Sequence, residues 1–148
     1  MPLSNRIKNQ NLLWRGAIGQ TEDSVSELDT LSQKQLWGLL VKTSSSSPVK
    51  IDVAQNLVDG FFKGVKDVVE MQKKEIDAAK RKKIREQSRE DLKNLNILWL
   101  DEMINSEAQL REKVALFWHG HFACRVVNSF FQQQLLDVVR ANALGSFK

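Results

Sequence analysis

The sequence predicts an all-α fold, an irregular bundle of several helices that includes one long charged helix. Apolar residues recur with a period of about 3.6 throughout the chain, and no segment of strand length alternates apolar and polar side chains between turn signals. Only two prolines occur, Pro2 and Pro48, and both lie outside the helical patterns. With 148 residues, of which 42% are hydrophobic, the chain has the size of one domain with one core.

Three helices are expected before the middle of the chain. The first covers residues 5–16, and Gly19 is a stop signal after it. Thr21 and Ser32 are predicted to cap the second and third helices, because hydroxyl oxygens accept hydrogen bonds from the unpaired N–H groups of a helix start. The apolar side chains predicted to be buried in these helices are Leu12, Leu13, Trp14, Val25, Leu28, Leu36, Trp37, Leu39 and Leu40.

A Ser/Pro linker is predicted at residues 44–51. Serine competes with helix hydrogen bonding, and proline disfavours helix in the residue before it. The linker divides an N-terminal helical cluster, residues 1–43, from residues 52–148, and we expect the two parts to form one folded unit. After the linker, Asp52 is predicted to cap a helix with the apolar stripe Leu57, Phe61, Val65, Val68 and Val69, which Gly60 and Gly64 weaken.

Residues 73–93 concentrate the charge of the chain. They contain nine lysines and arginines against five acids, whereas the rest of the chain is neutral, so the formal net charge of +4 resides here. On a helix, Leu92, Leu95, Trp99 and Met103 form one face, which continues backwards into a basic stripe at Arg81, Arg85 and Arg89. We predict one long helix with Ser88 as the position of any kink. The alternative is a helix break at Ser88, where a capping-box pattern places an acid three residues on.

Three hypotheses fit the basic stripe. Four consecutive cations at residues 80–83 point all around a helix, Glu86 and Glu90 interrupt the positive field, and no aromatic stacking residue lies in the run. A solvated helix is therefore the preferred interpretation. Docking to a further part of the protein's own fold or to an acidic protein surface is the second hypothesis, and nucleic-acid binding, which we regard as the weakest, is the third.

Two helices are predicted after the long one, over residues 107–120 and 128–142. Asn105 and Ser106 are expected to end the long helix and cap the next, and Asn128 to cap the last. The side chains predicted to face inward are Leu110, Val114, Phe117, Trp118, His121, Phe131, Leu135, Val138 and Val139.

His119 and His121 are the sharpest candidates for a metal or catalytic site. On a continuous helix, residues two apart point about 160° away from each other, so both histidines bind one ion only if the helix ends at Gly120. His121 and Cys124 share a face, but a zinc site needs at least three protein ligands. Because His121 extends the apolar stripe, we prefer a buried structural histidine. Metal binding and a catalytic role completed by other sequence stay open as alternatives.

The remaining candidates give no specific chemistry. All four tryptophans lie on apolar faces, where core packing explains them, and a ligand-stacking platform is the alternative. No phosphate-binding glycine loop or nucleophile elbow occurs, so no cofactor is expected. Cys124 is the only cysteine, which excludes an intrachain disulfide.

Four stretches carry a family resemblance. REKVALFWHGHFACR (residues 111–125) closely resembles the signature REKM-LFWHNHF of a large bacterial family, domain of unknown function 1800. In the same order, NLLWRGAIG (11–19), WLDEMINS (99–106) and QQQLLDVVRANALGSFK (132–148) are similar to the family's HLL-R-GFG, WL-RM and Q-LLR-HALGNFR segments. Asn11, Ile18 and Gly120 depart from the usual residues.

The resemblance implies that this chain is the N-terminal portion of a longer fold. Family members continue into a second motif, NENFARELMELFTLG, which is absent here. The expected partner is then the C-terminal part of the family's own fold or another protein, and self-association through exposed apolar faces is a further expectation. The family lends no established reaction.

Two principal function hypotheses follow. The first is a structural or interaction module with no catalytic site in this segment. The second is part of a metal-dependent or hydrolase-like enzyme in which His119 and His121 act with carboxylates from elsewhere. A third is nucleic-acid or anionic-surface binding through the basic helix. No apolar run is long enough to cross a bilayer and no secretory signal is visible, which favours the cytoplasm, although many members of the resembled family are exported.

Overall fold

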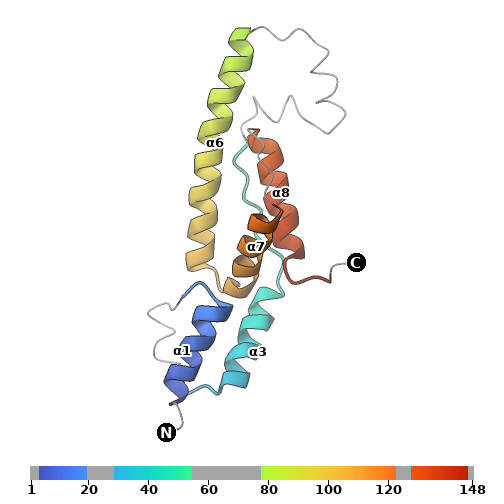
Figure 1. Cartoon of the computed structure of the whole chain (residues 1–148). Helices are drawn as coiled ribbons and strands as arrows, with labels where there is room; N and C mark the ends of the chain where they lie inside the picture. Colours follow the sequence, from blue (N-terminus) through green and yellow to red (C-terminus); the bar gives the residue numbers. More distant parts are fainter. Residues whose placement is uncertain (1–3, 20–28, 55–77, 123–127, 147–148) are drawn as a thin grey trace. The chain divides into compact units, whose positions relative to one another are not determined.

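The computed structural model describes residues 4–19, 29–54, 78–122 and 128–146. The elements in these ranges are all α-helices, as the sequence predicts (Figure 1). In chain order they are α1 (Asn5–Gly16), α3 (Gln33–Ser44), α6 (Ala78–Asn105), α7 (Gln109–His121) and α8 (Ser129–Asn142). Among them, no helix is both long and apolar enough to cross a membrane. The helices predicted after Thr21 and Asp52 lie outside the described residues.

The chain divides into two compact units, each assembled from separate stretches of sequence. Unit 1 combines Met1–Val49, Leu100–Phe122 and Val139–Lys148, and unit 2 combines Lys50–Trp99 and Ala123–Val138. α6 and α8 each contribute residues to both units.

The first two described helices each begin directly after a serine that caps them. Ser4 precedes α1, and its Oγ accepts a hydrogen bond from the N–H of Ile7 at 3.4 Å. Ser32 caps α3 in a full capping box: its Oγ accepts from the N–H of Gln35, while its own N–H donates to Gln35 Oε1 at 2.9 Å. The predicted cap at Ser32 is confirmed, and α1 covers the predicted residues 5–16.

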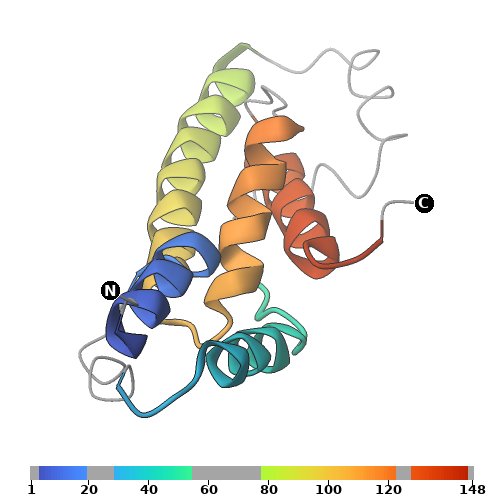
Figure 2. The same cartoon turned by 60° about the horizontal axis from the view of Figure 1, so that its bottom comes forward.

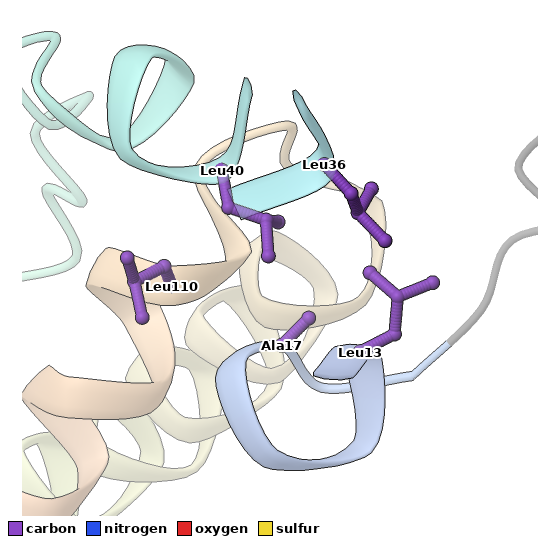
Figure 3. Close-up of a cluster of buried hydrophobic side chains, with 5 residues drawn as sticks. All are labelled: Leu13, Ala17, Leu36, Leu40 and Leu110. Atoms are coloured by element: carbon purple, nitrogen blue, oxygen red, sulfur yellow. The ribbon is translucent and has the colours of Figure 1, made fainter. Parts of the chain in front are cut away.

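In unit 1, α1, α3 and α7 pack against one another (Figure 2). Figure 3 shows the buried cluster at their meeting point, Leu13, Ala17, Leu36, Leu40 and Leu110. Leu12, Leu31 and Val114 pack against it. Each helix thus contributes one narrow apolar face to the cluster.

Three side chains predicted for this core are exposed. Trp14 is 59% exposed, Trp37 46% and Leu39 45%, so the prediction that they are buried was wrong. Leu36 and Leu40 lie four residues apart and share the face of α3 that enters the buried cluster. Leu39 and Trp37 point about 80° to either side of the middle of that face, and Trp37 lies at its edge, with part of its ring against Gly16 of α1.

α6 is a single helix of 28 residues, which confirms the predicted long helix. The helix is not broken at Ser88. The Ser88 side chain is buried and does not cap a helix start. In unit 2 the buried side of α6 consists of Ser88, Asp91, Leu95 and Trp99. Buried Asp91 accepts hydrogen bonds from Gln87 Nε2 at 2.8 Å and from Ser129 Oγ of α8 at 3.0 Å.

Gln133 of α8 organises the polypeptide that follows the predicted linker. Its buried amide oxygen accepts from the backbone N–H groups of Val53 and Ala54 at 2.7 and 3.0 Å, and its Nε2 donates to Asp52 Oδ1 at 2.9 Å. One side chain therefore accepts hydrogen bonds from two successive backbone N–H groups in unit 2. A helix-capping side chain satisfies unpaired N–H groups in the same way, but it lies next to them in the sequence.

The start of α8 agrees with the prediction and that of α7 does not. Asn128 Oδ1 accepts from the N–H of Phe130 at 2.9 Å, which confirms the cap. α7 begins at Gln109 after Ala108, two residues later than predicted. Ser106 Oγ accepts instead from the N–H of Ala108 at 3.1 Å, in the turn before the helix.

The inward stripes predicted for α7 and α8 are partly wrong. Phe117 and Val138 are 63% and 58% exposed, and His121 is exposed as well. The apolar stripe of α7 meets the α1 and α3 cluster only at Leu110 and Val114 and emerges into solvent beyond them. The other buried side chains of these two helices are largely polar: Arg111, Glu112, Ala115, Ser129, Gln133, Leu136, Val139 and Arg140.

The Leu36 and Leu40 face yields a matched pair of stability predictions. Leu40→Ala removes a buried side chain from the core cluster. We expect the free energy of unfolding, measured by urea denaturation, to fall by about 2–5 kcal/mol. Leu39→Ala, one residue away and exposed, is expected to cost about 0.5 kcal/mol or less, because leucine and alanine have similar helix propensities. Equal losses in the two variants would contradict the assigned face.

Candidate functional site

The largest polar feature of unit 1 is a set of charged side chains in its interior, here called the Arg/Glu network. It consists of Arg111 and Glu112 on α7, Arg140 on α8 and Glu102 on α6. Arg111, Glu112 and Arg140 are buried, with relative exposures of 4%, 0% and 1%, and Glu102 is half-buried. Charged residues are seldom buried to this degree unless they are paired.

Glu112 lies between two guanidinium groups. Arg140 binds it with two hydrogen bonds, from Nε to Oε2 at 2.8 Å and from Nη2 to Oε1 at 3.0 Å. Arg111 Nε donates to Oε1 at 3.0 Å. The planar guanidinium of arginine matches a carboxylate in this two-pronged geometry, which makes it one of the stronger ion pairs in proteins.

Glu102 supplies the second negative charge of the network. Its Oε1 lies 3.2 Å from Arg140 Nη2 and 4.0 Å from Arg111 Nη2. Two arginines thus face two glutamates, and the network is formally neutral. Neutrality matters here because an uncompensated buried charge costs several kcal/mol.

Each arginine also donates to a backbone carbonyl within the predicted linker, residues 44–51. Arg111 Nη1 donates to the carbonyl of Ser46 at 2.7 Å, and Arg140 Nη1 donates to the carbonyl of Val49 at 2.6 Å. The N–H of Arg111 itself donates to Ser44 Oγ at 3.2 Å. The network therefore holds the polypeptide after α3 against α7 and α8.

Lys113, the next residue of the signature, binds the end of α1. Its Nζ donates to the carbonyl of Trp14 and, at 2.6 Å, to that of Ala17. The last carbonyls of a helix lack intrahelical partners and carry the negative end of the helix dipole. A lysine there supplies both a hydrogen-bond donor and a favourable positive charge. All three charged residues of the Arg-Glu-Lys sequence are thus engaged in packing α7 against its neighbours.

The end of α7 carries a cluster of rings, here called the aromatic cluster: Phe117, Trp118, His121 and Phe122. The rings of His121 and Phe117 stack with centroids 6.2 Å apart, and Trp118 and Phe122 meet the His121 ring edge-on at 5.9 and 5.1 Å. Trp118 is half-buried and its Nε1 donates to the carbonyl of Ala143 at 3.3 Å. This bond anchors the cluster to the end of α8.

The structure corrects the predicted place of His121. His121 is exposed, not buried, because α7 extends beyond the core and His121 is its last residue. His119 is half-buried on the same helix, and residues two apart on a helix point about 160° away from each other. No group of three or more His, Cys, Asp or Glu side chains suited to a metal ion lies in the described ranges. Cys124 lies outside them.

Sequence reasoning missed the Arg/Glu network altogether. The helical pattern gave Arg111, Glu112 and Arg140 no place among the inward-facing side chains, since charged residues are rarely buried. The only available signal was the resemblance: Arg111 and Glu112 open the signature, and Arg140 lies in another matching segment. A family motif that keeps charged residues beside apolar ones indicates that the charges have internal partners.

The basic stripe of α6 lies in solvent. Arg81, Arg85 and Arg89 are exposed, as are Lys82 and Lys83. Lys82 Nζ lies 4.0 Å from Glu86 Oε1, the i, i+4 pair expected on a helix surface.

Comparison with known proteins identifies the family. The family described as "Protein of unknown function (DUF1800)" matches residues 11–148, which is most of the chain, so the chain belongs to this family. A search of curated proteins and a search of solved structures returned no match.

The Arg/Glu network predicts that loss of one carboxylate is costly. Glu112→Gln leaves two buried guanidinium groups short of a counter-charge, and we expect the free energy of unfolding to fall by about 3–5 kcal/mol. Glu86→Gln, which removes an exposed partner of Lys82, should change it by about 0.5 kcal/mol or less. Urea denaturation followed by circular dichroism measures both. A small effect of Glu112→Gln would mean that the network does not hold the fold.

The contact of Lys113 with α1 gives a smaller, local prediction. Lys113→Met keeps the aliphatic stem but removes the donor to the Trp14 and Ala17 carbonyls, and we expect a loss of about 1 kcal/mol. Hydrogen exchange should accelerate at the last turn of α1 and not in α8. Lys34→Met on exposed α3 surface is the control, and exchange that rises equally in both variants would contradict the capping role.

Proposed function

We propose that this chain is a helical structural and interaction module that carries no reaction of its own. One observation supports the proposal above the others: the charged residues of its signature, Arg111 and Glu112, are buried and paired with Arg140 and with backbone carbonyls. Groups engaged in this way hold helices together and do not face a substrate. The signature is then the part of the sequence that shapes the fold.

The exposed apolar side chains support the interaction role. Trp14, Trp37 and Phe117 in unit 1 each expose close to half or more of their surface. Large aromatic side chains in solvent are typical of surfaces that bind another polypeptide. The proposed partner is a protein surface, either a further part of a longer family protein or a separate protein.

A second candidate is an enzyme or metal protein that uses His119 and His121. The exposed position of the His121 ring favours it, because a group that meets a substrate must be accessible. The aromatic cluster argues against it, since His121 already packs against Phe117 and Phe122. This candidate needs ligands or carboxylates in addition to the two histidines.

Metal analysis separates the two candidates. We expect the protein, incubated with zinc, manganese or ferrous iron and then desalted, to retain far less than one equivalent of metal. The double variant His119→Ala/His121→Ala should keep the same low content, with a loss of stability of about 1 kcal/mol from the ring contacts.

The control is Phe117→Ala, which disturbs the same ring cluster without removing a metal ligand. One equivalent of metal bound by the wild-type protein and by Phe117→Ala, but lost in the double histidine variant, would refute the proposal and establish the second candidate.

A further inference from the structure

The first turns of α6 carry many positively charged side chains, and those that the structure describes are exposed. Residues 80–89 contain six lysines and arginines and a single acid, Glu86. Arg81, Lys82, Lys83, Arg85 and Arg89 are all exposed. The ion pair described in this stretch, between Lys82 and Glu86 at 4.0 Å, is exposed on both sides and weak.

Three arginines form a ladder along one side of this helix. Arg81, Arg85 and Arg89 lie four residues apart, so successive guanidinium groups advance by about 6 Å along the axis and turn by about 40°. Ser88, which is buried at 2% relative exposure, lies about 20° from Arg81 and about 60° from Arg85 around the axis. The side of α6 that packs inside unit 2 from Ser88 onwards therefore continues before it as an exposed surface that carries Arg81 and Arg85, with Arg89 at its edge.

This arrangement weakens an isolated helix. Like charges four residues apart repel each other, which is unfavourable by a few tenths of a kcal/mol for each pair. Carboxylates from outside would remove this repulsion. Within the described ranges, the counter-charge found for residues 81–89 is that of Glu86 on Lys82, so an acidic partner would supply more.

We propose that Arg81, Arg85 and Arg89 of α6 dock an acidic segment of a protein partner, with a carboxylate opposite each turn of the helix. The inference rests on the proposed interaction role and names the chemistry of the partner. Arginine suits this task because its planar fork binds a carboxylate with two hydrogen bonds and keeps its charge at any physiological pH.

The surroundings of the ladder favour an acidic polypeptide over nucleic acid. Glu86 and Glu90 are exposed on the same turns, and next to a phosphate backbone both would only repel. A protein partner offers lysines or arginines to pair with them. Half-buried Ile84, between Arg81 and Arg85, adds an apolar contact, whereas residues 78–98 contain no aromatic side chain on which bases could stack.

Fluorescence anisotropy with a defined probe tests the proposal. The probe is a fluorescein-labelled helical peptide with glutamate at every fourth position, mixed with the full chain at low salt. Arg81→Gln/Arg85→Gln/Arg89→Gln should weaken its binding by about tenfold or more, because three charge-assisted pairs are lost. Binding of the wild type should also weaken as ionic strength rises.

The matched control is Arg15→Gln/Lys34→Gln/Lys42→Gln, which removes three exposed charges from α1 and α3. It lowers the net charge equally, and circular dichroism verifies that both variants remain helical. The inference is upheld if the control binds like the wild type while the α6 variant does not.

Three outcomes overturn it: no binding of the peptide by the wild type, equal weakening in both variants, or tight binding of a duplex of about 20 base pairs that the α6 variant loses while its peptide binding is unchanged. None of these outcomes depends on His119 or His121. Failure here is therefore distinguishable from failure of the proposed function, which the metal analysis decides.

Discussion

The fold of unit 1 depends on the requirement that the buried carboxylate of Glu112 be compensated. Burial of one unpaired charge would cost several kcal/mol, comparable to the whole stability of a small domain. Arg140 meets the requirement only when α8 is in place, and Arg111 only when the polypeptide after α3 accepts its remaining donors. A loosely packed arrangement can bury apolar side chains, but it does not bring the charged groups of this network within hydrogen-bonding distance of one another. We therefore expect the network to favour one packing over others that the apolar cluster alone permits, a role that buried polar groups take in some proteins.

α7 is buried on two sides at its start, whereas near its end Phe117 is exposed and Trp118 is only half-buried. Leu110 faces the apolar cluster of α1 and α3, while Glu112 points to the opposite side, about 160° away, into the Arg/Glu network. Seven residues after Leu110, Phe117 lies on the same side as Leu110 but is exposed, because no core residue of α1 or α3 meets it. The same apolar stripe thus serves as core in its first half and as surface in its second.

The sequence alone predicted what local chemistry decides. The range of α1, the caps at Ser32 and Asn128 and the continuity of the long helix α6 follow from residue types within a few positions of one another, and all agree with the structure. Burial was predicted less well, because a side chain on a helix is buried only where a neighbouring helix covers it. Trp14 lies on a predicted apolar face and is nevertheless exposed. The Arg/Glu network was beyond such reasoning: Arg140 lies 28 residues from Glu112, and no periodicity links a charged residue to so distant a partner.

Charge is distributed along this chain in a way that bears on how it meets a partner. Unit 1 places arginines and glutamates in its interior, where they neutralise each other and project little field into solvent. The net positive charge instead belongs to the sequence between residues 73 and 93, and its described part is exposed on α6. A field from one exposed region steers an oppositely charged partner towards that region and raises the association rate more than the final affinity. Affinity then has to come from close contacts such as guanidinium to carboxylate pairs, so orientation and tight binding depend on the same few arginines.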